Sequence, residues 1–288
     1  MAAITSSNAK DSVVVITGGS SGIGLAVAKE FLSAGAEPKE DSSGVKRVLG
    51  VSSNVTSWEE TQSLMKTAFD TYHQLDYVFA NATGADRTTI PHDIFGKPNY
   101  DATYTMMQSV ANTVHAAAGY LAASPGGAGP LASMNEFVAQ NQTSQRDKAI
   151  VITGSQAGFV EYDINPRYAV SKGAMGSYIW ANKSRLADVG IRINCVAPAW
   201  VDTPLLAPMI KLGIVLPEHI IPMETVTGSV MRFFNDSTIS GVITSIPVPS
   251  PDVKTLDISA AYQDDRFRLS FCGPLFAKAA AAAAAAKQ

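Results

Sequence analysis

The segment Thr17-Gly18-Gly19-Ser20-Ser21-Gly22-Ile23-Gly24 lies between a run of β-branched residues at 13–17 and an amphipathic stretch at 23–34. The run is typical of a buried parallel strand, and the stretch has helical spacing. Glycines in such a turn let the backbone bend tightly and approach an anion closely. The N–H groups and positive dipole end of the following helix then point at that anion. The segment therefore predicts a phosphate-binding turn, with a purely structural tight turn as the alternative.

The rest of the chain alternates between strand-like and helix-like segments. Further strands are predicted at residues 45–51, 76–80, 148–153, 192–197 and 241–248, and further helices at 58–72, 100–123 and 168–189. This alternation predicts an α/β fold with a parallel sheet covered on both faces. We expect one domain over residues 1–250, a long loop at 124–147 and an irregular tail over 251–288, whose alanine run is too short for a stable isolated helix.

Composition excludes several classes of function. The chain has 288 residues, a net charge of −3 and no basic cluster of the kind that nucleic acid or an anionic membrane favours. Cys195 and Cys272 are its only cysteines, so we expect reduced packing residues, no disulfide framework and no metal site. The sequence lacks both a membrane-spanning apolar run and a signal-peptide pattern at its start, which favours a cytoplasmic location.

Tyr168 and Lys172 lie four residues apart at the start of a predicted helix, so the phenol and the ammonium share one face. An ammonium stabilises a nearby phenolate and so helps a tyrosine to exchange protons at neutral pH. The same spacing also arises when a lysine only covers apolar surface. Ser155 follows the predicted strand 148–153, at the edge of a parallel sheet where ligands bind. Its hydroxyl is suited to hydrogen-bond a substrate oxygen on which charge develops.

These residues together resemble the short-chain dehydrogenase/reductase family. Residues 17–24 resemble its TGxxxGxG signature, Tyr168 and Lys172 its YxxxK motif, and Ser155 precedes the tyrosine by the thirteen residues usual there. The resemblance implies a three-layer, Rossmann-like, doubly wound sheet and an NAD(P)-dependent oxidoreductase. It also implies that Tyr168 is the general acid/base, that Lys172 holds the cofactor ribose, and that Ser155 orients the substrate.

Three further segments support the resemblance. Residues 79–84 resemble the NNAG segment, residues 194–204 resemble NxVxPGxxxT, and Asn112 resembles the asparagine that binds a proton-relaying water. Thr83 and Ala199 replace family glycines, and Ala199 fits only if its φ is negative. The residues implied to contact NAD or NADP are Gly18, Ser20, Ser21, Gly22, Ile23, Gly24, Asn54, Val55, Asn81, Ala82, Tyr168, Lys172, Pro198, Val201 and Thr203.

The sequence departs from the family where the second strand is usual. Residues 37–44 are polar and contain Pro38, which excludes a buried central strand. We predict that residues 45–51 instead pair beside residues 13–17, giving six strands rather than seven. Asn54 stands where the family commonly has an aspartate near the adenine, so the adenosine pocket is altered. The sequence does not separate NAD from NADP, and NADP is slightly favoured.

The predicted reaction interconverts a secondary alcohol and a ketone on a mostly hydrophobic small molecule, in secondary metabolism. The apolar, proline-punctuated stretch at about residues 204–224 is the expected substrate lid. The altered adenosine pocket leaves open a non-redox isomerase or cyclase that uses the same tyrosine and serine, or a catalytically silent binding protein. Small residues on the helices at 100–123 and 168–189 permit close packing between subunits, and with the family resemblance they imply a homodimer or homotetramer.

Overall fold

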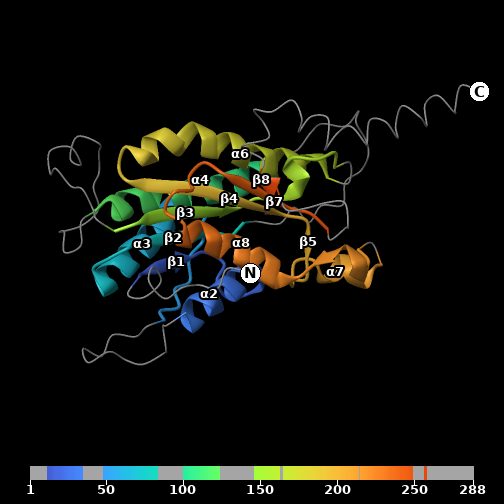
Figure 1. Cartoon of the computed structure of the whole chain (residues 1–288), viewed down its shortest axis with the longest axis horizontal. Helices are drawn as coiled ribbons and strands as arrows, with labels where there is room; N and C mark the ends of the chain where they lie inside the picture. Colours follow the sequence, from blue (N-terminus) through green and yellow to red (C-terminus); the bar gives the residue numbers. More distant parts are fainter. Residues whose placement is uncertain are drawn as a thin grey trace, which may run out of the picture.

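A parallel β-sheet forms the middle layer of the molecule (Figure 1). The computed structural model describes residues 12–34, 48–83, 100–123, 146–162, 165–213, 215–248 and 256–257. Within them the sheet has the order β1-β2-β3-β4-β7-β8, in which β1 to β7 are parallel and β8 is antiparallel to β7. The strands are β1 (Val14–Ile16), β2 (Tyr77–Ala80), β3 (Lys148–Thr153), β4 (Ile191–Pro198), β7 (Ile243–Ile246) and β8 (Leu256–Asp257).

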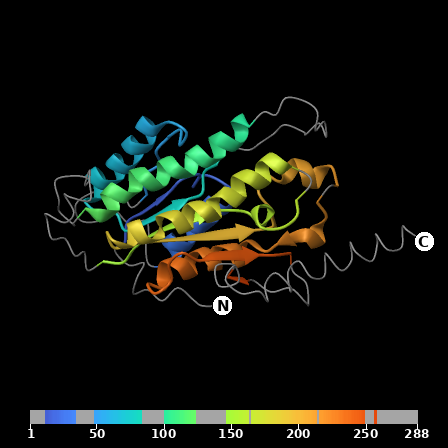
Figure 2. The same ribbon diagram turned by 90° about the horizontal axis from the view of Figure 1, so that it is seen from above.

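Helices cover both faces of the sheet, as Figures 1 and 2 show. One face carries α3 (Trp58–Tyr72), α4 (Asp101–Ala122) and α6 (Pro166–Ala187), and the other carries α2 (Gly22–Ser33) and α8 (Met223–Asn235). Successive side chains of β2 enter opposite cores. Val78 packs with α3, α4 and α6, whereas Phe79 packs with α2 and α8. The prediction of a doubly wound parallel sheet is confirmed.

Short elements follow the carboxyl end of β4. They are β5 (Trp200–Val201), α7 (Ala207–Lys211), the 3₁₀ turn η2 (Pro217–His219) and β6 (Ile220–Ile221). β5 and β6 form a separate two-stranded parallel sheet that ties the start of this segment to its end. Another 3₁₀ turn, η1 (Gln156–Gly158), follows β3. The region expected to form the lid is therefore a closed loop with its own hydrogen-bonded base.

Two sequence expectations are wrong in the part that the structure describes. Residues 48–51 form no strand, and the side chains of Val48 and Leu49 are 56% and 42% exposed. No core covers this stretch, and Gly50 weakens any strand pairing there. The sixth strand is instead β8, in the tail that was expected to be irregular. Asp257 is held there by Arg232 and Thr244. Residues 37–47 lie outside the described residues, so the absence of a strand over 37–44 and the start of a strand at 45–47 stay predictions.

Ion pairs fix the amino ends of the strands, opposite the edge where Ser155 lies. Asp76, only 1% exposed, accepts hydrogen bonds from Arg146 Nε at 2.7 Å and from the backbone N–H of Val13 at 2.8 Å. Arg192 donates to both carboxylate oxygens of Asp147 at 2.8 and 2.6 Å. Such paired geometry gives strength and direction to a partly buried ion pair.

Among the described helices, none combines the length and apolar character needed to cross a bilayer.

Lys148 links the start of β3 to the end of α4. Its side chain is buried, and its ammonium donates to the carbonyl oxygens of Leu121 and Ala123, the latter at 3.0 Å. A cation at this position suits the negative end of the helix dipole. Burial nevertheless lowers the pKa of Lys148 to about 8, from an ordinary value of 10.5.

This lowered pKa predicts a pH dependence of stability. Between about pH 8 and 10.5 the unfolded chain retains the Lys148 proton while the folded chain has released it, so rising pH favours folding. The unfolding free energy of the wild type, minus that of Lys148→Met, should increase across this window by about 1.4 kcal/mol for each pKa unit of displacement. Below pH 8 the difference should stay constant. Urea titrations from neutral to alkaline pH measure it, and parallel profiles for the two proteins would contradict the assignment.

Candidate active site

The glycine-rich turn between β1 and α2 has no room for a side chain at its centre. Gly18 has a φ of +68° and Gly22 a φ of +51°, left-handed backbone that favours glycine. A Cβ built on Gly24 would lie 2.3 Å from the carbonyl oxygen of Gly18. Hydrogen at this position is therefore what lets the first turn of α2 sit directly against the loop.

The amino end of α2 fits an anionic group. Ser21 is the N-cap, but its side chain makes no capping hydrogen bond, and the first turn contains no acidic residue. The positive end of the helix dipole is therefore not neutralised by its own first turn. Ser20 and Ser21 are exposed beside it, and Ile23 packs against the core below. A pyrophosphate would meet open N–H groups here, so these residues fit a dinucleotide cofactor.

Hydrogen bonds join the carboxyl ends of β1, β2 and β3. The Thr17 hydroxyl accepts from the backbone N–H groups of Asn81 at 3.1 Å and Ala82 at 3.0 Å. The Asn81 amide donates to the carbonyl oxygen of Thr17 at 3.2 Å and accepts from the Thr153 hydroxyl at 3.0 Å. Three parallel strands thus end in one polar frame, which fixes the glycine turn relative to β3.

Lys172 and Tyr168 lie together on the first turns of α6. The Lys172 side chain is 2% exposed, and its Nζ donates to the carbonyl oxygen of Thr153 at 3.2 Å. This ammonium lies 5.6 Å from the centroid of the Tyr168 ring. Asn165 caps the helix by accepting from the N–H of Tyr168 at 2.9 Å, which fixes the backbone that carries the phenol. The predicted shared face is confirmed.

Ser155 lies at the carboxyl end of β3, two residues beyond the carbonyl that Lys172 binds. Its Oγ accepts from the N–H of Ala157 at 3.3 Å and donates to the carbonyl oxygen of Pro198 at 3.5 Å. The second bond is at the limit of hydrogen-bonding distance, so the hydroxyl hydrogen is available to a better acceptor. A Cβ on Gly158 would lie 2.5 Å from the backbone carbon of Lys172, which shows how closely η1 packs on α6. The serine, tyrosine and lysine are therefore gathered at one edge of the sheet.

Comparisons with known proteins agree with this geometry. The family model described as short chain dehydrogenase matches residues 12–211, which is more than half of the chain. The chain belongs to the short-chain dehydrogenase family. It is a dehydrogenase/reductase that acts on CH–OH groups with NAD(P).

Its relatives include fungal enzymes. The chain is 30% identical over 219 residues to 5'-hydroxyaverantin dehydrogenase of Dothistroma septosporum, covering 68% of this chain and 69% of that protein. It is 28% identical over 222 residues to the short-chain dehydrogenase/reductase ascJ of Acremonium egyptiacum, covering 72% and 69%. The solved structure of 3-ketoacyl-(acyl-carrier-protein) reductase from Brucella melitensis complexed with NADH shares the fold. Its TM-score is 0.63 at 19% identity, covering 83% of this chain and 97% of that one.

The side-chain hydrogen bonds of Asn112 that the structure shows are made with the segment before α3, not with Ser155, Tyr168 or Lys172. Its amide donates to the carbonyl oxygens of Val55 and Thr56 at 3.1 and 3.2 Å. These contacts give no support to the proton-relay role that the sequence predicts for it. Two α4 side chains contact the first turns of α6: the Thr103 hydroxyl donates to the carbonyl oxygen of Arg167 at 3.1 Å, and the Met106 sulfur accepts from the Ser171 hydroxyl at 3.5 Å. Neither contact follows from the sequence alone, because each depends on how α4 packs against α6.

The exposed Asn54 side chain closes a local turn. Its Oδ1 accepts from the N–H and the hydroxyl of Thr56, and the backbone N–H of Asn54 donates to the Glu60 carboxylate at 2.7 Å. Val55 is half-buried, and its carbonyl is one of the two held by Asn112. Asn112 therefore anchors the segment implied to lie beside the adenine.

The segment after β4 reaches back to the glycine turn. A Cβ on Gly22 would lie 3.1 Å from Thr203 Cγ2, so these two predicted cofactor contacts are neighbours. Pro198 ends β4, and Val201 is fixed by pairing with Ile221. Among the described non-glycine residues only His73 has a positive φ, so Ala199 meets the condition for replacing glycine.

Cys195 is a packing residue. It is fully buried, and burial raises the pKa of its thiol to about 12, which keeps it protonated and unreactive. Cys272 lies outside the described residues. Within the described part of the chain, no cluster of three or more histidine, cysteine or acidic side chains is placed to hold a metal ion.

The fit of the glycine turn to a dinucleotide predicts the effect of Gly24→Ala. The added methyl group would collide with the carbonyl oxygen of Gly18, so the turn must shift away from the pyrophosphate position. We expect the affinity for NADH and NADPH, measured by nucleotide fluorescence, to fall at least 10-fold. Gly228→Ala in α8 is the matched control because a Cβ there meets nothing within 4 Å. Equal affinities of the two folded variants would contradict the assignment.

Proposed function

We propose that this enzyme interconverts a secondary alcohol and a ketone on a mostly hydrophobic small molecule of secondary metabolism. This proposal is supported mainly by the position of Ser155, Tyr168 and Lys172 near the carboxyl end of β3. There they adjoin the hydrogen-bonded frame that holds the glycine turn. Ligands of parallel α/β sheets bind at this edge.

Each of the three side chains has a proposed task. The Tyr168 hydroxyl gives a proton to the substrate oxygen in reduction and takes it in oxidation. The Lys172 ammonium stabilises the phenolate form of Tyr168 and offers its remaining donors to the ribose. Ser155 hydrogen-bonds the substrate oxygen and holds it opposite the phenol. The bound nicotinamide supplies the hydride or accepts it, so no metal is required.

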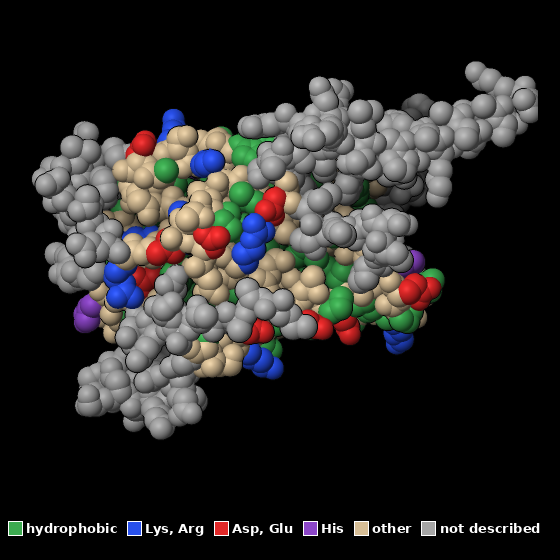
Figure 3. Space-filling model, viewed as in Figure 1, with side chains coloured by type: hydrophobic (Ala, Val, Ile, Leu, Met, Phe, Trp, Pro, Cys, Tyr) green, Lys and Arg blue, Asp and Glu red, His purple; other side chains and the backbone are tan. Residues whose placement is uncertain are grey.

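The surface after β4 supports an apolar substrate. Leu205, Leu212 and Leu216 are 59%, 74% and 42% exposed around α7, and Figure 3 shows hydrophobic side chains at the surface over this helix. Exposed apolar side chains on a segment that begins at the cofactor residue Thr203 suit a lid that closes on substrate. The similarity to 5'-hydroxyaverantin dehydrogenase and ascJ supports the assignment to secondary metabolism.

We further propose NADP as the preferred cofactor, in an adenosine pocket that lacks the usual second strand. Lys46 and Arg47 are the cations that the sequence offers to a 2′-phosphate, and they lie outside the described residues. Comparing the affinities for NADPH and NADH tests this preference directly.

Tyr168→Phe tests the proposed chemistry. The variant keeps the ring beside Lys172 and removes only the hydroxyl, so nucleotide affinity should stay within about 2-fold of the wild type. Loss of the general acid should lower kcat by about 10²- to 10⁴-fold in a spectrophotometric assay with a methyl ketone.

The matched control is Tyr104→Phe, which removes a hydroxyl from a side chain of α4 that is 71% exposed. Its turnover should equal that of the wild type. Undiminished turnover by Tyr168→Phe would rule out the proposed role of its hydroxyl.

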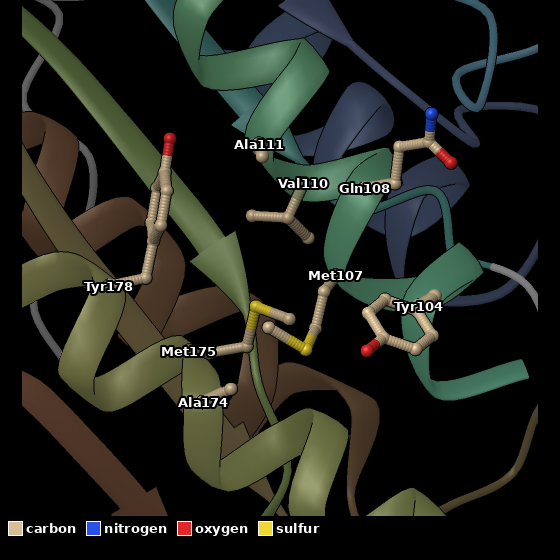
Figure 4. Close-up of a pocket in the computed structure, with 8 residues that line it drawn as sticks. All are labelled: Tyr104, Met107, Gln108, Val110, Ala111, Ala174, Met175 and Tyr178. Carbon is tan, nitrogen blue, oxygen red and sulfur yellow. The ribbon is translucent and has the colours of Figure 1, made fainter. Parts of the chain in front are cut away.

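We also propose that the enzyme forms a homodimer through α4 and α6. An apolar groove of about 340 Å³ lies between these helices, and Met107 and Met175 point toward each other in it (Figure 4). Ala111 and Ala174 line it and let a second helix pair approach closely. Tyr104 and Met107 are 71% and 38% exposed at its mouth. A two-fold axis across this face would bury both copies of the groove at once.

Met107→Glu should therefore dissociate the dimer. The carboxylate would be buried against a second apolar face without a partner, which costs several kcal/mol. We expect light scattering after size-exclusion chromatography to show a monomer. Leu212→Glu, which also places a carboxylate at an exposed apolar position, should remain dimeric. A wild type that is already monomeric, or a Met107→Glu dimer, would contradict the proposed interface.

A further inference from the structure

Two aromatic rings, those of Tyr162 and Trp200, lie in series with the ring of Tyr168, the proposed proton donor. The ring centroids of Tyr168 and Tyr162 are 6.1 Å apart, with planes inclined at 51°. Those of Tyr162 and Trp200 are 6.2 Å apart, with planes inclined at 48°. All three side chains are half-buried, so part of each ring remains accessible to a ligand. The series is continuous with the residue that exchanges the substrate proton.

The two outer rings stand on well-fixed backbone. Tyr168 lies in the first turn of α6, where Asn165 caps the helix. Trp200 lies in β5 and pairs with Ile220 of β6, at the base of the lid segment. Tyr162 comes from the connection between η1 and α6 and touches both neighbours. We call Tyr162 and Trp200 the aromatic wall. The wall begins beside the Tyr168 phenol and runs toward the base of the lid segment.

An aromatic wall distinguishes between hydrophobic substrates of equal size. A planar ring gains edge-to-face or offset contacts with Tyr162 and Trp200 in addition to the burial of its surface, whereas an aliphatic chain gains only the burial. Fixed rings also lose little conformational entropy when they bind a flat partner. The carbon to be oxidised or reduced must stay at Tyr168, so it must be a substituent close to the ring system.

We propose that Tyr162 and Trp200 are specificity-determining residues, and that they select a substrate whose reacting alcohol or ketone is attached to a planar aromatic ring system. This inference rests on the proposed function, because it takes the position of the reacting carbon from the role of Tyr168. It assigns the wall a part in the choice of substrate and no part in proton transfer.

The test compares two ketones with the same number of carbon atoms, methyl naphthyl ketone and a straight-chain methyl ketone. The ratio of their kcat/KM values is the aromatic preference. We expect the wild type to prefer the naphthyl ketone, and Tyr162→Leu and Trp200→Leu each to lower the preference by about 3- to 10-fold. Tyr162→Phe and Trp200→Phe, which keep a ring, should retain most of it. Trp58→Leu on α3 is the matched control and should not change it.

A second measurement separates this inference from the proposed function. Calorimetric binding of the two ketones to the NADP⁺-loaded protein needs no turnover. If no ketone is reduced but the leucine variants lose affinity for the naphthyl ketone alone, the proposed function fails and the aromatic wall stands. If turnover is lost in Tyr168→Phe as expected but the folded leucine variants keep the wild-type preference, the wall is overturned and the function stands. A wild type without aromatic preference in either measurement also overturns it.

Discussion

The hydrogen bond from the buried ammonium of Lys172 to the carbonyl oxygen of Thr153 ties the residues proposed for proton transfer to the sheet. A buried cation needs such a partner because it has lost its hydration. Thr153 in turn donates to Asn81, and Asn81 holds Thr17 at the start of the glycine turn. Displacing any of these strand ends would move the phenol relative to the cofactor position, so the catalytic half and the nucleotide half of the site share one frame.

The two ends of the sheet differ in their polar contacts: ion pairs connect the strands at the amino ends, and the candidate active site lies at the carboxyl ends. At the amino ends, Arg146 with Asp76 and Arg192 with Asp147 connect strands through short charged contacts. At the carboxyl ends, the polar groups bond to one another and to backbone. The Ser155 hydroxyl accepts from the N–H of Ala157 and donates only a long bond to the carbonyl of Pro198, which a substrate oxygen can replace as acceptor. This arrangement lets the loops at the functional edge vary while the core remains fixed.

The residues proposed to select the substrate belong to segments outside the Thr17–Asn81–Thr153 frame. Trp200 and the exposed leucines around α7 belong to a loop closed by the β5–β6 pair, and Tyr162 belongs to the entry into α6. None of these contributes a hydrogen bond to the Thr17–Asn81–Thr153 frame. Substitutions in them are therefore expected to change the preferred substrate more readily than the cofactor or the proton donor.

The doubly wound sheet could be predicted from the amino-acid sequence, because β-branched runs, helical periodicity and glycine spacing are local patterns that act through backbone sterics. The sequence also predicted that Tyr168 and Lys172 share a face, since that follows from helix geometry alone. Three features follow from the packing of distant segments and not from local patterns: the hydrogen-bond partners of Asn112, the position of residues 48–51 outside the sheet, and the pairing of Leu256–Asp257 with β7. These outcomes depend on which distant groups supply a partner. Val55 and Thr56 accept from the amide of Asn112, and Arg232 and Thr244 donate to Asp257. Val48 is 56% exposed, and among the described residues no core cluster includes it. The contacts of the aromatic wall with Tyr168 also depend on tertiary structure. Its rings come from segments that meet only because the carboxyl ends of β3 and β4 lie side by side.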